Sequence, residues 1–124
     1  FEAVAQKAIA EGQLPIQELI AFFDDREHNP QARRLAFEWI SRADAAFADR
    51  VIPLSLDDPS SEMRRDAVTW HMSRGRELLD SGDRPAATRT YQEALAGAGD
   101  EDQVQELAKV LKELGHDVDV VRHR

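Results

Sequence analysis

The sequence predicts an all-α fold, an α-solenoid of about seven antiparallel helices in a right-handed superhelix, on three observations. Residues 33–39 and 64–70 are near-copies of each other, 31 positions apart. Self-similarity at a period of about 20 to 50 residues is typical of repeat proteins, in which each unit packs on the next. Apolar residues also recur at helical spacing along most of the chain. The connections between the predicted helices span about two to six residues, which makes neighbouring helices antiparallel.

In the first half of the chain, four helices are predicted, at residues 2–11, about 15–23, 30–42 and about 44–57. The first ends before Gly12, and Pro15 opens the second. Asn29 is a strong N-cap candidate for the third helix, because Pro30 then occupies the first helical position, where a missing N–H costs nothing. Pro53 is expected to kink the fourth helix or to shorten its last turn.

In the second half, three helices are predicted, at residues 59–80, 84–98 and 100–114. Gly82 and Asp83 form a helix stop that is followed directly by an N-cap. Asp100 and Gln103 have the spacing of a capping box, in which each side chain bonds the backbone N–H of the other residue. Gly115 closes the last helix. We expect residues 1–115 to form one helical-repeat domain and residues 116–124 to be a tail or a linker stub to a missing domain.

Composition and charge exclude several classes of protein. The net charge is −8, although residues 26–89 balance eleven Arg against eleven acidic residues. Nucleic-acid binding normally requires a basic excess, so nucleic acid is an unlikely partner, although the arginine-rich middle could form a local patch. The chain has no cysteine, and no apolar run approaches the roughly 18 residues of a membrane span. Residue 1 is Phe, so we expect a piece of a larger, bacterial, multidomain protein.

Two stretches of the chain resemble HEAT repeats, in which an apolar helix and an Asp turn precede a helix that carries an Arg and an Ala. The resemblance covers residues 14–75 and depends on Leu14, Pro15, Leu19, Ile20, Phe22, Phe23, Asp24, Asn29, Pro30, Arg33, Ala36 and Trp39, and then on Val51, Ile52, Pro53, Asp57, Asp58, Pro59, Arg64, Ala67 and Trp70. The second stretch departs from the first, because its Pro53 and Asp57 are only four residues apart. Its Pro-to-Arg spacing is also five residues instead of three.

The following stretch, residues 68–99, resembles a tetratricopeptide repeat. The small and aromatic positions of that family are occupied by Gly75, Leu78, Gly82, Asp83, Ala87, Tyr91 and Ala94. Gly99 stands where the family usually has a closing proline. Both families are mostly protein-binding scaffolds, so the resemblance implies protein binding.

The basic residues of the two repeated helices are the predicted binding residues. They are Arg33, Arg34, Arg64, Arg65, His71 and Arg74. Guanidinium groups on one ridge would suit an acidic peptide or a phosphate. The alternative is structural: one Arg of each pair bonds the acidic turn beside it, at residues 24–25 or 57–58, and ties one repeat to the next.

The tryptophans and histidines are predicted to be structural or solvated. Trp39 and Trp70 occupy equivalent positions among apolar neighbours, which favours core packing over ligand stacking. The four histidines lack the spacing of a metal site, which needs three or four converging ligands. Residues 116–123, with two His and two Asp, could gather a metal only loosely, and a solvated linker stub is the favoured interpretation.

The sequence has no phosphate-binding loop, no nucleophile elbow and no cysteine nucleophile. We therefore predict a non-catalytic helical-repeat module that mediates protein–protein or interdomain interaction, with no cofactor and no metal. The predicted partner is an acidic segment of another protein or of a neighbouring domain of the same chain. Two alternatives stay open: a structural spacer next to an enzyme domain, and a HEAT-like nucleic-acid-binding protein.

Overall fold

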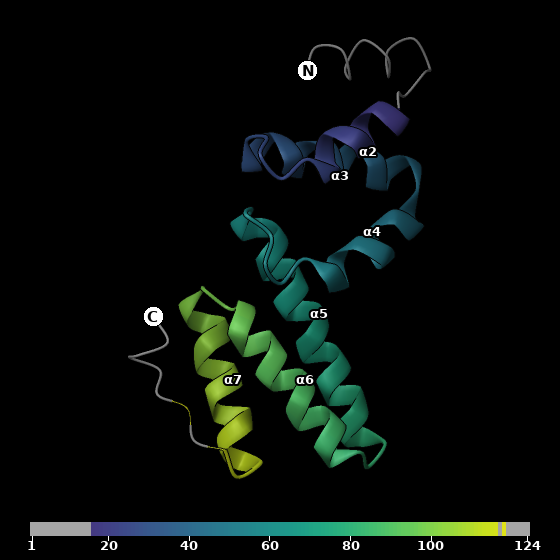
Figure 1. Ribbon diagram of the computed structural model, residues 1–124. Helices are drawn as coiled ribbons and strands as arrows, with labels where there is room; N and C mark the ends of the chain where they lie inside the picture. The colour runs from purple at the N-terminus through teal and green to yellow at the C-terminus, as the bar shows by residue number, and fades with distance from the viewer. Residues whose placement is uncertain (1–15, 117, 119–124) are drawn as a thin grey trace. The chain divides into compact units, whose positions relative to one another are not determined.

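The computed structural model describes residues 16–116 and residue 118 (Figure 1). Within these residues every regular element is a helix and no strand is present, so the all-α prediction is confirmed. The elements are α2 (Ile16–Asp24), α3 (Pro30–Ala43), α4 (Ala45–Val51), the 3₁₀ turn η1 (Ile52–Leu54), α5 (Ser61–Asp80), α6 (Arg84–Gly97) and α7 (Glu101–Glu113). The helix predicted at residues 2–11 lies outside the described part of the chain.

The chain divides into two compact units, residues 1–50 (unit 1) and residues 51–124 (unit 2). Unit 1 is built around three aromatic rings, with Phe23 from α2, Phe37 from α3 and Phe47 from α4. All three are buried, and their ring centroids lie 5.8 to 6.1 Å apart in tilted or edge-on pairs. Such arrangements are the favourable ones for aromatic side chains, because they place ring edges against ring faces. The apolar side chains of Leu19 and Ile40 are also buried in this unit.

Unit 2 contains a hairpin of α5 and α6, with α7 packed along α6 (Figure 1). Its buried core comprises Val68, Ala87, Tyr91, Ala94, Ala98, Val104, Leu107 and Leu111. The closest approach in this core is between the backbone of α5 at Gly75 and the ring of Tyr91. A Cβ atom at Gly75 would lie 2.8 Å from that ring, so glycine is what allows the two helices to pack at this distance.

The predicted N-caps of two helices are confirmed. The Asn29 side chain accepts hydrogen bonds from the backbone N–H groups of Gln31 and Ala32 at the start of α3. The Asp83 side chain accepts from the N–H of Ala86 at the start of α6. Gly82, the predicted stop, has a φ of +88°, in the left-handed region that favours glycine.

Two helix boundaries differ from the prediction. The helix expected to continue to residue 57 ends at Val51, and only the 3₁₀ turn η1 follows it. Pro53 explains this end, because it lacks the N–H that would continue the α-helix. The next helix was expected at Pro59 but begins at Ser61. Its N-cap is Ser60, whose hydroxyl accepts from the N–H of Met63 at 3.3 Å.

The prediction that both tryptophans lie in the core is wrong for Trp70, which is 39% exposed. Its ring meets the ring of His71 edge-on, with centroids 4.8 Å apart. The core of unit 2 instead takes Val68 and Gly75 from α5, so the buried face of this helix does not include position 70. The equivalent Trp39 of unit 1 is half-buried, and Arg42 lies 5.0 Å from its ring centroid.

Candidate functional site

The first arginine of each repeated pair caps the segment that precedes its own helix. Arg33 is only 1% exposed, and its Nε donates to the backbone carbonyl of Phe23 at 2.7 Å. Arg64 occupies the equivalent position 31 residues later, and its guanidinium donates to the backbone carbonyl of Asp58, also at 2.7 Å. The Phe23 carbonyl belongs to the last turn of α2, and the Asp58 carbonyl belongs to the connection between η1 and α5. The sequence-based alternative placed an arginine against each acidic turn: the acceptor of Arg64 is the backbone oxygen of Asp58 in the second turn, and the acceptor of Arg33 is the backbone oxygen of Phe23, one residue before the first.

The second arginine of each pair has a carboxylate partner. Arg34 forms an i,i+4 pair with Glu38 at 3.3 Å. Arg65 pairs with Asp100 at 2.7 Å and makes two hydrogen bonds to Asp102, at 2.7 and 3.0 Å. The hydrogen bonds from Arg65 lower the pKa of Asp102 to about 2, and the two carboxylates in turn raise the pKa of the guanidinium. Such a bidentate pair links α5 to the start of α7.

The other two predicted binding residues also have partners inside the chain. The Nε2 of His71 lies 3.0 Å from the backbone carbonyl of Pro53, which ties α5 to η1. Arg74 pairs with Glu77 at 3.2 Å. Of the six predicted residues, Arg33 and Arg34 therefore belong to unit 1, and the remaining four belong to unit 2. Each one has a protein partner, and their role in binding stays a prediction.

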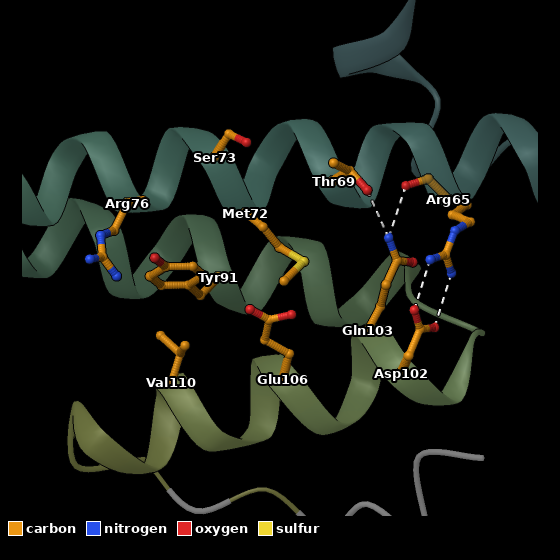
Figure 2. A pocket seen from close by; sticks show the side chains of 10 residues that line it. All are labelled: Arg65, Thr69, Met72, Ser73, Arg76, Tyr91, Asp102, Gln103, Glu106 and Val110. Carbon is orange, nitrogen blue, oxygen red and sulfur yellow. Dashed lines mark hydrogen bonds and ion pairs between the residues drawn. The ribbon is translucent and has the colours of Figure 1, made fainter.

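The described part of unit 2 has a groove of about 470 Å³ between α5 and α7 (Figure 2). We call it the α5/α7 groove. Its walls are Arg65, Thr69, Met72, Ser73 and Arg76 from α5 and Asp102, Gln103, Glu106 and Val110 from α7. Tyr91 of α6 lies between the two walls, and the Arg65–Asp102 pair stands at one end (Figure 2). A second hollow of about 640 Å³ adjoins the groove along α7 and includes Lys109 and Glu113.

Tyr91 lies toward the Arg76 end of this groove (Figure 2) and is 3% exposed. Burial raises the pKa of its hydroxyl, while the positive charge of Arg76 lowers it and the carboxylates of Asp80 and Glu106 raise it. Among the described residues no group forms a hydrogen bond with this hydroxyl. A buried tyrosine usually finds a partner for its hydroxyl. The Tyr91 hydroxyl is not among the buried atoms that lack a hydrogen-bond partner, so it is reached from the groove and can bind water or a ligand there.

Gln103 does not form the predicted capping box with Asp100. Its side-chain Nε2 donates to the backbone carbonyl of Arg65 at 3.1 Å and to the hydroxyl of Thr69 at 2.9 Å. Asp100 makes no side-chain bond to the start of α7, because its carboxylate binds Arg65 instead. Both residues of the expected box thus serve contacts between α5 and α7. The Oε1 of Gln103 is buried without a hydrogen-bond partner.

Sequence reasoning missed Tyr91, Glu106 and Gln103 as groove residues. The sequence feature that pointed to Tyr91 was the match of Gly75 and Tyr91 to the small and aromatic positions of a tetratricopeptide repeat. That signal indicates close packing of two helices, whereas the groove also depends on where α7 lies.

Within residues 16–116 and 118, no three His, Asp or Glu side chains gather to hold a metal ion. The tail considered for a loose metal site, residues 116–123, falls mostly outside the described residues. None of the described helices is both long and apolar enough to cross a membrane. Comparison of the chain with protein families, characterised proteins and solved structures gives no match.

Proposed function

We propose that this chain is a non-catalytic helical-repeat module that mediates protein–protein or interdomain interaction within a larger protein. The observation that carries the proposal is the α5/α7 groove, with a buried tyrosine whose hydroxyl has no partner among the described residues. Its walls combine apolar side chains, Met72 and Val110, with the hydroxyl groups of Thr69 and Ser73. Concave sites with this mixture bind ligands through apolar contact and a few oriented polar groups.

The dimensions of the groove suit a peptide segment. The groove and its adjoining hollow include α7 residues from Asp102 to Glu113. At a rise of 1.5 Å per residue this stretch of α7 is roughly 16 Å long, which equals about five residues of extended chain. A short peptide of a partner therefore matches the length of the wall.

The repeat class belongs to the same proposal: two HEAT-like helix pairs followed by a tetratricopeptide-like pair, stacked as a right-handed solenoid. The equivalent bonds of Arg33 and Arg64 to backbone carbonyls support a true internal repeat. Ala36 and Ala67, which are also 31 positions apart, are both fully buried. The contact of Gly75 with Tyr91 supports the tetratricopeptide-like pair, because a small and an aromatic residue meet where that resemblance expects them.

The test is a selection from a random peptide library displayed on phage, with the 124-residue chain as the target. Selected peptides are then measured by fluorescence anisotropy against Ser73→Trp, which places an indole in the groove. Gln92→Trp is the matched control, because Gln92 is exposed on α6 and does not line the groove. We expect binding to the chain and to the control, and a large loss with Ser73→Trp. Peptides that bind all three proteins equally, or the absence of any selected peptide, would contradict the proposal.

A structural spacer beside a neighbouring domain is the second candidate. The engagement of Arg33, Arg34, Arg64 and Arg65 in internal contacts favours it, because these groups then stabilise the module itself. The peptide selection separates the two candidates, since a spacer has no groove-dependent ligand.

A further inference from the structure

Glu106 is the groove residue whose charge has no compensation from its neighbours. Arg65 is paired with Asp102 across one end of the groove, and Arg76 pairs with Asp80 on its own helix at 3.6 Å. No cation among the described residues lies within ion-pair distance of the Glu106 carboxylate. Lys109 also lacks an ion-pair partner there, but it lines the adjoining hollow and not the groove itself.

Glu106 and Tyr91 both line the α5/α7 groove, and the Tyr91 hydroxyl is at the end of its ring nearer Arg76 (Figure 2). Figure 2 shows the Glu106 side chain rising from α7 toward Tyr91 and Met72. Three charged groups act on the Tyr91 hydroxyl, namely Arg76, Asp80 and Glu106. Arg76 has the largest charge effect of the three, and because Arg76 pairs with Asp80, Glu106 is the one of these charges that has no ion-pair partner among the described residues.

We propose that the α5/α7 groove binds a basic peptide segment and seats one Lys or Arg side chain between the Glu106 carboxylate and the Tyr91 hydroxyl. This inference rests on the proposed function and names the chemistry of the partner. The cationic head group donates to the carboxylate and to the hydroxyl oxygen, both of which are acceptors. The aliphatic stem of the same side chain packs against Met72 and Val110, as long basic side chains do on apolar surfaces.

This partner has the opposite charge from the one that the sequence predicted. The prediction of an acidic segment assumed unpaired arginines, and the arginines of the repeated pairs are bonded within the chain. The net charge of −8 also attracts a basic partner over distance, at a rate that falls as salt is added.

The inference is tested on the same selected peptides, with Glu106→Gln as the variant and Glu93→Gln as the control. Glu93 is exposed on α6 and lies outside the groove. We expect the groove-binding peptides to contain Lys or Arg, and to bind Glu106→Gln about tenfold more weakly, as for loss of one charge-assisted hydrogen bond. Binding to Glu93→Gln should be unchanged, and added salt should weaken binding to the unmodified chain more than to Glu106→Gln.

The outcomes separate this inference from the proposed function. Peptides that are sensitive to Ser73→Trp but lack basic residues, or that bind Glu106→Gln as tightly as the original chain, would overturn the basic partner and leave the interaction module standing. If no selected peptide is sensitive to Ser73→Trp, both proposals fail. Circular dichroism of each variant establishes that the helical fold is retained.

Discussion

Replacement of Gly75 by alanine tests the closest packing contact in unit 2. Alanine is favoured over glycine inside a helix by about 1 kcal/mol, so the exchange would stabilise an unobstructed α5. Here the new Cβ would lie 2.8 Å from two atoms of the Tyr91 ring, against about 3.5 Å or more for an ordinary carbon contact. Overpacking of this kind costs about 1–3 kcal/mol. We therefore expect a net loss of about 1 kcal/mol in the free energy of unfolding of unit 2.

The assay is urea unfolding followed by tryptophan fluorescence. Trp39 and Trp70 belong to different units, so a Trp39→Phe background leaves Trp70 as the reporter of unit 2. A loss of about 1 kcal/mol lowers the midpoint without changing the slope of the transition.

A second background identifies the cause of the loss. Tyr91→Leu lacks the outer ring atoms that the new Cβ would meet, so alanine at position 75 should there stabilise unit 2 by up to about 1 kcal/mol. The difference between the two backgrounds is a coupling energy of about 2 kcal/mol between residues in contact. If alanine has the same effect with Tyr91 and with leucine at position 91, the ring does not limit the packing of α5, and the reasoning is refuted.

Three further predictions concern single side chains. Arg33→Met should destabilise unit 1 by about 2 kcal/mol, because a buried carbonyl at the end of α2 loses a charge-assisted hydrogen bond. Thermal unfolding should show a much smaller loss of stability for Arg50→Met, since Arg50 is exposed. Equal losses for the two variants would contradict the capping role of Arg33. The Asp102 carboxyl should titrate near pH 2 in NMR, so its stabilising pair is complete above the unfolded pKa of about 4 and is lost as the pH falls toward 2. Its pKa should return toward 3.8 in Arg65→Gln, and a value already near 3.8 in the unmodified chain would argue against the pair. Ser60→Ala should cost about 1 kcal/mol by removing the N-cap of α5, whereas an unchanged unfolding midpoint would show that the cap contributes nothing.

Helix starts were the part of the fold that the sequence predicted best, because the signals for them are local. Asn29 with Pro30 and Gly82 with Asp83 each act on backbone groups within a few residues, and the structure has both as expected. The end of α4 was harder to place, since Pro53 permits either a kink or a stop.

The contacts that build the candidate site could not be predicted, because they join residues far apart in sequence. Asp100 and Gln103 have the local pattern of a capping box, yet each binds a group of α5 that is about 35 residues away. The hydrogen bond from the Arg65 guanidinium to the Asp100 carboxylate joins two charged groups and is stronger than one from a neutral backbone N–H, so the tertiary contact displaces the local one. The position of Tyr91 between two helices likewise depends on α7, which the spacing of apolar residues does not locate.

The two arginine pairs have the same sequence pattern, but only their first arginines make equivalent contacts. Arg33 and Arg64 make the same kind of bond, to a backbone carbonyl that precedes their own helix, which accounts for arginine at both positions. Their neighbours diverge: Arg34 pairs within its own helix, whereas Arg65 joins α5 to α7 at the end of the groove. The first arginine of each pair therefore makes the contact that the two repeated helices share. The second arginine makes a contact that differs between the two units. In unit 2 it fixes one end of the α5/α7 groove, where Glu106 is a carboxylate without a partner among the described residues.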